Sequence, residues 1–187
     1  RQLLLRTGLS RAVGGRVRVA GGWAYLRTFA SEEIGTPYAV WDHRAWQMVQ
    51  LSHGFGRLSL VHRARLEQRF FGDDATEAAG DWTFAWRGRY QLRATTPLPG
   101  TLGTRAYAVA SGELFAPFGP HAGTPEVDQS RFNLGVGARL SPTLRVELSY
   151  LNRATVDDGR AHTRDHALQV AIASSAPLAT GRRRPAP

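Results

Sequence analysis

Polar and apolar side chains alternate along the middle of the chain. Between Arg57 and Phe71, charged and hydroxyl side chains take most odd positions, and leucine, alanine and phenylalanine take most even ones. Between Asp81 and Thr95 the same alternation sets charged and amide groups against large aromatic side chains. A period of two places successive side chains on opposite faces of a β-strand. Both segments are therefore predicted to be long strands with one charged face and one apolar face.

Seven further segments of about 10–15 residues also read as strands, and no segment has a helical period. The facing of one of them, Arg44–His53, stays open because polar and apolar residues occur on both of its parities. The seven segments are Gln2–Val13, Arg16–Ala30, Arg44–His53, Arg105–Ala116, Gln129–Ser141, Leu144–Arg153 and Arg164–Ser174.

The predicted connections alternate in length. Short turns at 14–15, 54–56 and 141–143 and a medium one at 97–104 alternate with long loops at 31–43, 72–80, 117–128 and 155–163. Short turns on one side and long loops on the other are typical of outer-membrane barrels. Strands of this length suit a tilted membrane crossing, which needs about 9–11 residues, better than the usual soluble strand of about 5–6. We therefore predict an all-β fold, an antiparallel up-and-down transmembrane β-barrel.

Aromatic residues gather near the predicted strand ends, where they suit the boundary between lipid and water. Phe29, Trp46, Phe70, Phe71, Phe115 and Phe118 belong to this group. The side chains expected to face lipid or to form an aromatic girdle are Trp23, Tyr25, Trp82, Phe84, Trp86, Tyr90 and Tyr150. The alternative is a soluble lipocalin-like barrel, which would place the aromatic residues inside and the arginines in water.

The number of predicted strands, nine, is odd and leads to a further prediction. Bacterial barrels have an even number of strands with both termini on the short-turn side. Here the first strand runs into a short turn, so a closed barrel needs one more strand before Arg1, ten in all. Residues 1–176 are predicted to form the barrel, and residues 177–187 a flexible basic tail.

Charge adds a candidate site. All 24 basic residues are arginine, against 15 acids, for a net charge of +9, and there is no cysteine. The arginines are spread over many strands rather than clustered in one basic element, which argues against nucleic acid as a partner. Most of them share the polar face with a few acids, so neighbouring strands would bring guanidinium groups and carboxylates together. The predicted interior set is Arg63, Arg65, Glu67, Arg69, Arg87, Arg89, Arg93, Glu113, Arg131, Arg139, Arg145 and Glu147.

Three functional hypotheses follow from that interior. An ion-pair network that fills a small barrel makes it a structural or partner-binding protein of the cell envelope. The excess of arginine over acid would alternatively favour anions in a narrow pore. A lipid-modifying barrel enzyme is a third hypothesis, but the chain has neither Gly-x-Ser-x-Gly nor His-Glu-x-x-His. We therefore predict a non-enzymatic protein with no catalytic residues, cofactor or metal site.

Ordered motifs also resemble a known family. They run from His62–Phe70 through Arg87–Tyr90, Gly112–Phe115, Arg131–Gly137 and Glu147–Tyr150 to His166, within a similarity that spans about residues 3–173. This order is similar to the outer-membrane barrel family catalogued as domain of unknown function 2490. The resemblance implies a location in the outer membrane of Gram-negative bacteria, and it brings no established activity. The partners that we expect in that location are outer-membrane lipid and another envelope protein.

Overall fold

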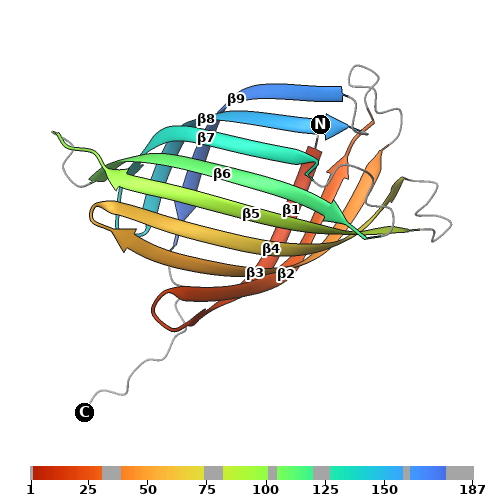
Figure 1. Ribbon diagram of the computed structural model, residues 1–187, viewed down its shortest axis with the longest axis horizontal. Coiled ribbons are helices and arrows are strands. Elements are labelled where there is room, and N and C mark those ends of the chain that lie inside the picture. Colours follow the sequence, from red (N-terminus) through yellow and green to blue (C-terminus); the bar gives the residue numbers. More distant parts are fainter. Residues whose placement is uncertain are drawn as a thin grey trace, which may run out of the picture.

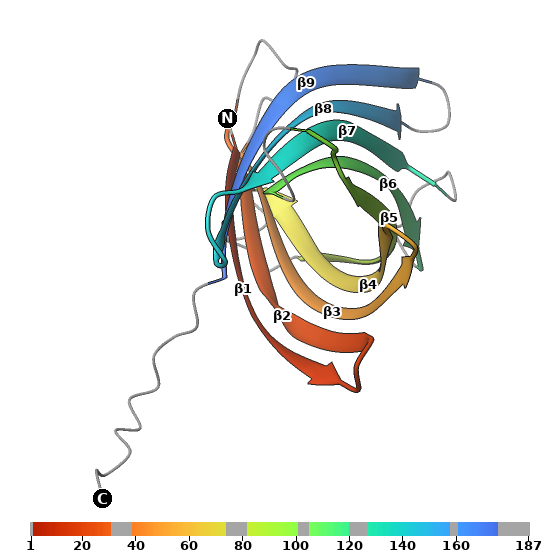
Figure 2. The ribbon, with the colours of Figure 1, turned by 90° about the vertical axis from the view of Figure 1, so that its left-hand side faces the viewer.

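Nine antiparallel strands form one sheet in the computed structural model, which describes residues 2–30, 39–73, 82–100, 105–119, 127–157 and 161–175. Each strand pairs with the next along the chain, so the sheet order is β1 to β9 without a crossover. Figure 1 shows the strands lying side by side, and Figure 2 shows the sheet curling into a half-barrel. The strands are β1 Gln2–Val13, β2 Val17–Thr28, β3 Val40–Phe55, β4 Leu58–Asp73, β5 Thr83–Pro97, β6 Ala106–Phe118, β7 Gln129–Arg139, β8 Leu144–Asp157 and β9 Ala161–Ser174.

The nine predicted strands are confirmed, but the strands reach into several predicted loops, most extensively in two places. Residues 40–43, expected in a loop, belong to β3, where Val40 pairs with Asp73 of β4. The expected charged loop at 155–163 is mostly strand, because Thr155 pairs with Thr163 and only residues 158–160 separate β8 from β9. Polar side chains misled the prediction in both places, since a strand whose inner face is charged continues through residues that look like loop. The predicted tail at 177–187 lies outside the described residues.

Glycine makes the tightest turns. Gly14, between β1 and β2, has a φ of 79°, and Gly56, between β3 and β4, has a φ of 58°. Both angles lie in the left-handed region, which glycine enters without the steric cost of a Cβ atom. The sequence prediction of short turns at these two places is confirmed.

The curl gives the sheet two chemically different faces. Residues on even positions of β3 and odd positions of β4 to β9 share one face, as the registers of successive strands require. On this face Arg93 of β5 reaches Glu147 of β8 at 2.6 Å, although two strands lie between them. Neighbouring strands are about 4.8 Å apart, so such a contact requires this face to be the concave one.

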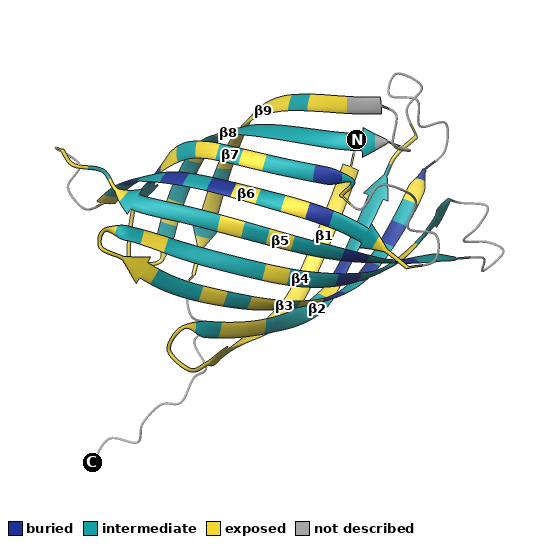
Figure 3. Ribbon diagram, in the orientation of Figure 1, coloured by how far each residue is buried: buried dark blue, intermediate teal, exposed yellow. Residues whose placement is uncertain are grey.

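Burial follows the same division (Figure 3). The buried strand residues, both apolar and charged, lie on the concave face, including Trp46, Glu67 and Phe115. The convex face keeps large apolar side chains exposed, for example Leu134 at 55%, Leu168 at 80% and Ile172 at 72%. A soluble antiparallel sheet packs its apolar face into the core, so this arrangement is inverted.

Close packing inside the curl depends on two glycines of neighbouring strands. Gly8 of β1 pairs with Gly22 of β2, which pairs with Trp46 of β3. A Cβ atom on Gly8 would lie 2.5 Å from the Trp46 ring, and one on Gly22 would lie 2.1 Å from the carbonyl oxygen of Thr7. The indole therefore lies over a surface that only glycine leaves open. Trp46 was expected at the lipid boundary, and this prediction is wrong because its strand presents even positions to the inside.

The two edges of the sheet are β1 and β9. Successive strands are antiparallel, so the first and the ninth run in the same direction. None of the residues that the structure describes forms a helix long and apolar enough to cross a membrane.

Candidate functional site

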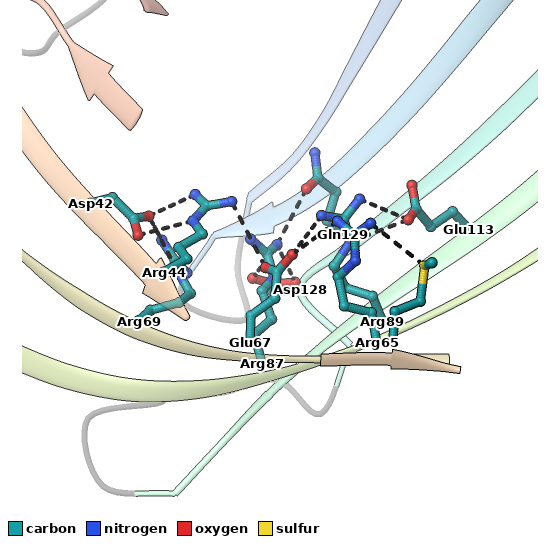
Figure 4. A network of polar contacts seen from close by, with 11 residues as sticks. Asp42, Arg44, Arg65, Glu67, Arg69, Arg87, Arg89, Glu113, Asp128 and Gln129 are labelled. Atoms are coloured by element: carbon teal, nitrogen blue, oxygen red, sulfur yellow. Dashed lines mark hydrogen bonds and ion pairs between the residues drawn. The ribbon is translucent and has the colours of Figure 1, made fainter. Parts of the chain in front are cut away.

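All twelve residues predicted for the interior lie on the concave face. The strands that carry them are β4 to β8, and each position has the inward parity of its strand. Ion pairs of 4.0 Å or less between described residues involve nine of the twelve, namely Arg65, Glu67, Arg69, Arg87, Arg89, Arg93, Glu113, Arg145 and Glu147. Figure 4 shows the central part of this network.

Asp42 organises the end of the network next to the long β2–β3 and β4–β5 connections. It is 3% exposed and accepts hydrogen bonds from two guanidinium groups. Arg44, two residues along β3, donates from Nε at 2.9 Å and from Nη2 at 2.6 Å. Arg69, opposite Arg44 on β4, donates to the same carboxylate from Nε at 3.1 Å and from Nη2. Arg44 therefore makes a bidentate pair with both oxygens of Asp42, which is a strong arrangement for an arginine and a carboxylate, whereas both donors of Arg69 share Oδ2.

Asp42 and Arg44 were absent from the predicted set. Asp42 fell in a predicted loop, and the facing of the segment that begins at Arg44 was open. The missed signal is the polar series at even positions, Asp42, Arg44 and Gln50, which is interrupted by Trp46 and Met48.

Glu67 is the centre of the network. It is 1% exposed, and Arg89 donates from Nη1 to its Oε1 at 2.7 Å. Arg65 Nη1 lies 3.7 Å from Oε1, and Arg44 Nη1 lies 3.8 Å from Oε2. Arg89 in turn donates from Nε and Nη2 to Glu113 Oε1. One carboxylate thus balances cations from three strands, β3, β4 and β5.

Arg87 extends the network to the start of β7. Its Nη2 donates to both carboxylate oxygens of Asp128 at 3.0 Å and to Gln129 Oε1 at 3.2 Å. Neither partner was in the predicted set: Asp128 ended a predicted loop, and Gln129 began a predicted strand but the set held only arginine and glutamate.

Phe115 is the apolar centre of the charged face. Its ring is 2% exposed and lies beneath three guanidinium groups, those of Arg87 at 4.7 Å, Arg89 at 4.5 Å and Arg131 at 4.7 Å from the ring centre. A cation over an aromatic face is attracted by the ring quadrupole, and the attraction strengthens when water is excluded. Phe115 was expected at the lipid boundary. That expectation is wrong, because an odd position on β6 faces inward. Phe71 was also expected at the lipid boundary, and this prediction is wrong because an odd position on β4 faces inward.

A second cluster lies toward the short-turn end. Glu147 Oε1 accepts hydrogen bonds from Arg93 Nη2 at 2.6 Å and from the Tyr107 hydroxyl at 2.7 Å. A Cβ atom on Gly137 would lie 2.4 Å from the Tyr107 ring, so the lack of a side chain at Gly137 leaves the space that this ring occupies. Arg139 and Arg145 flank the cluster and are exposed.

The predicted lipid-facing aromatic residues lie on the other side of the sheet. Trp23 and Tyr25 of β2, Phe84, Trp86 and Tyr90 of β5, and Tyr150 of β8 all have the convex parity. Trp82, just before β5, packs against His43 of β3 with ring centres 5.5 Å apart. Further ring contacts join Tyr25 to Trp41, Phe70 to Phe84, and Trp86 to Phe118. These residues form two groups of ring contacts, and the pairing of His43 with Phe70 across β3 and β4 places the groups next to each other. Together they make an aromatic band on the convex face at the long-loop ends of β2 to β6.

The histidines give no catalytic arrangement in the described part of the chain. His62 contacts the Tyr90 hydroxyl at 2.7 Å, and His166 contacts Tyr150 and Asn152, in both cases on the convex face. Among the side chains that the structure describes, no histidine is hydrogen-bonded to a carboxylate, and no three metal-binding side chains come together.

Comparison with known proteins agrees with the resemblance noted in the sequence. The model of a family described as "Protein of unknown function (DUF2490)" matches residues 1–164, from β1 into the beginning of β9. No curated protein and no solved structure matches the chain. The match covers most of the sequence, so the chain belongs to the DUF2490 family.

Proposed function

We propose that this chain forms the wall of a β-barrel in the outer membrane of a Gram-negative bacterium. The observation that carries the proposal is the inversion of the sheet, with charge buried on the concave face and large apolar side chains exposed on the convex face. Lipid is the environment in which an exposed apolar barrel surface is stable, and outer-membrane barrels have a polar interior. The aromatic band at one end of the convex face suits the boundary between lipid and water. A lipocalin-like barrel requires the reverse arrangement.

The edges of the sheet support a ten-stranded barrel. In a membrane every backbone hydrogen-bonding group needs a partner, so open edges have to be closed. The parallel direction of β1 and β9 means that one strand running the other way would pair with both in the antiparallel sense. A tenth strand between these edges, from elsewhere in the protein or from a partner, completes the barrel in this proposal.

The proposed role is structural or partner-binding. The ion pairs around Asp42, Glu67 and Glu147 run from one end of the concave face to the other and connect non-neighbouring strands. Such a network holds the wall of a small barrel in one curvature, in the place of an apolar core. An anion-favouring pore is the second candidate. It is favoured by concave-face arginines that have no carboxylate within hydrogen-bonding distance among the described residues, for example Arg6, Arg63, Arg65 and Arg131.

Planar-bilayer conductance of the refolded full-length protein separates these roles. If the network fills the interior, the protein inserts into the bilayer and carries no steady current. A steady anion-selective current that falls in the Arg87→Glu or Arg89→Glu variant would replace the structural role with the pore. Failure to associate with lipid under conditions that give folded protein in detergent would contradict both roles.

A further inference from the structure

A polar cavity of about 150 Å³ interrupts the ion-pair network on the concave face. It is lined by Arg6 of β1, Met48 of β3, Arg63 and Arg65 of β4, Arg89 and Gln91 of β5, and Glu113 of β6. The curl of the sheet brings Arg6 together with residues of β4, β5 and β6, strands that are not neighbours of β1 in the sheet order. Four guanidinium groups therefore surround one space.

Only one of these four cations is neutralised by hydrogen-bonded carboxylates. Arg89 donates to Glu67 at 2.7 Å and to Glu113 at 2.8 Å, which occupies its Nη1, Nε and Nη2 groups. The same two carboxylates are the acids whose charges act on Arg6 and Arg65. The cavity therefore keeps an excess of positive charge within the described part of the protein.

Arg63 is held by neutral groups. Its Nε donates to Gln50 Oε1 at 3.0 Å and its Nη1 donates to Gln91 Oε1 at 3.2 Å. Two amide oxygens fix the plane of the guanidinium without cancelling its charge. The charges acting on Arg63 include those of Arg93 and Arg145, which are also positive.

Arg65 is oriented by apolar contacts. Its guanidinium lies 4.8 Å from the centre of the Trp46 ring, and its Nη2 lies 3.8 Å from Met48 Sδ. Its Nη1 is buried and makes no hydrogen bond, with Glu67 Oε1 at 3.7 Å. A buried donor of a charged group that lacks an acceptor is costly, so a site of this kind is completed by an acceptor from outside. Because Trp46 is itself packed over Gly8, the orientation of Arg65 is built into the fold.

The geometry points to a binding site for a phosphate group, formed by Arg6, Arg63 and Arg65 around this cavity. A phosphate monoester carries a charge of about −1.5 to −2 and offers three strong acceptor oxygens, which matches three cations without hydrogen-bonded acids better than a single carboxylate does. Guanidinium forks are also the side chains best suited to phosphate oxygens. The inference rests on the proposed function only for its setting, since barrel closure would place the cavity in the lumen.

The concave position indicates a soluble phosphate compound rather than a lipid headgroup, because the apolar face is the opposite one. Titration calorimetry of the refolded protein in detergent, at low ionic strength, with inorganic pyrophosphate as the probe tests the site without a bilayer. We expect saturable binding of one equivalent. A water-soluble short-chain phosphatidic acid, used below its micelle concentration, is expected to bind no more tightly than pyrophosphate, and much tighter binding would assign the site to a lipid headgroup and overturn the soluble ligand.

Charge-removing variants locate the site. Arg63→Gln and Arg65→Gln are each expected to weaken pyrophosphate binding by about 10- to 100-fold, the range for a lost hydrogen bond to a charged group. Arg6→Gln is the variant that leaves the folded network intact, because Arg6 is exposed and makes no hydrogen bond or ion pair with the described residues. It is expected to weaken binding at least several-fold. Arg139→Gln removes the same charge from the concave face away from the cavity and serves as the matched control.

Equal weakening in Arg139→Gln and Arg6→Gln would show general charge attraction and would overturn the site. Absence of saturable binding to the folded wild-type protein would overturn it as well. Neither result would affect the proposed membrane location, and failure of the protein to insert into lipid would leave the calorimetric result standing. The two proposals therefore fail separately.

Discussion

The Glu67→Ala variant is expected to lose about 3–5 kcal/mol of unfolding free energy, the usual cost of removing one partner of a buried ion pair. Glu67 is almost completely buried, and it is the shared acid of Arg44, Arg65 and Arg89. Its removal leaves three guanidinium groups facing one another in a space with little water. Like charges at short range in such a space repel strongly, since the screening of bulk solvent is missing.

Denaturant titration of the refolded protein, followed by tryptophan fluorescence, measures this loss. Glu67→Gln keeps the shape of the side chain and one acceptor for Arg89, so its loss is expected to be smaller than that of Glu67→Ala. Asp165→Asn is the matched control, because Asp165 pairs with Arg153 while both side chains are more than 40% exposed. Exposed pairs contribute about 0–1 kcal/mol. Equal losses at positions 67 and 165 would contradict a central role for Glu67.

The second large effect is expected on the convex face. Leu168→Arg places a charge at the middle of β9 on a side chain that is 80% exposed. If lipid covers this face, the substitution is expected to cost about 2–4 kcal/mol for folding into vesicles, the range for arginine at the midplane of an outer-membrane barrel. If water covers this face, the same substitution replaces a water-exposed apolar side chain by a charged one, and the free energy of folding is expected to change very little.

Gln169→Arg is the control for Leu168→Arg. It adds the same charge one residue further along the strand, where the side chain points to the concave face. We expect little change in folding into vesicles for Gln169→Arg, because the interior of a membrane barrel accepts charge. Equal costs for the two variants would mean that the two faces of β9 meet the same surroundings, and would contradict a lipid-covered convex face.

The prediction from sequence succeeded where alternation was regular and failed where one strand face mixed chemistries. In the middle of β4 and β5, from Arg63 to Arg69 and from Arg87 to Arg93, every inward residue is charged or amide, so periodicity placed Glu67 and Arg89 on the correct face. In β3 the inward face includes Trp46 and Met48, while Gln47 faces outward, and periodicity therefore could not assign the segment. Arg44 was missed for this reason, whereas Asp42 was missed because it fell in a predicted loop.

Packing between non-neighbouring strands was beyond the reach of a periodic pattern. The same holds for the register between strands, which places Phe115 of β6 beneath Arg87 and Arg89 of β5 and Arg131 of β7, its two neighbouring strands. An aromatic residue near a strand end looks the same in sequence whether it meets lipid or a guanidinium group. The cavity lined by Arg6 and Arg65 is hidden in the same way, since it joins β1 to β4.

The central claim is that the convex face lies against lipid and the concave face against a polar interior. The chain contains no cysteine, so single cysteines can be introduced one at a time along β9, from residue 166 to residue 172, and spin-labelled without background. Electron paramagnetic resonance in vesicles then compares collisions with oxygen, which concentrates in hydrocarbon, and with a polar nickel complex. The account predicts a period of two, with labels at even positions reached by oxygen and labels at odd positions reached by the nickel complex. Labels reached equally by the nickel complex on both parities would contradict it.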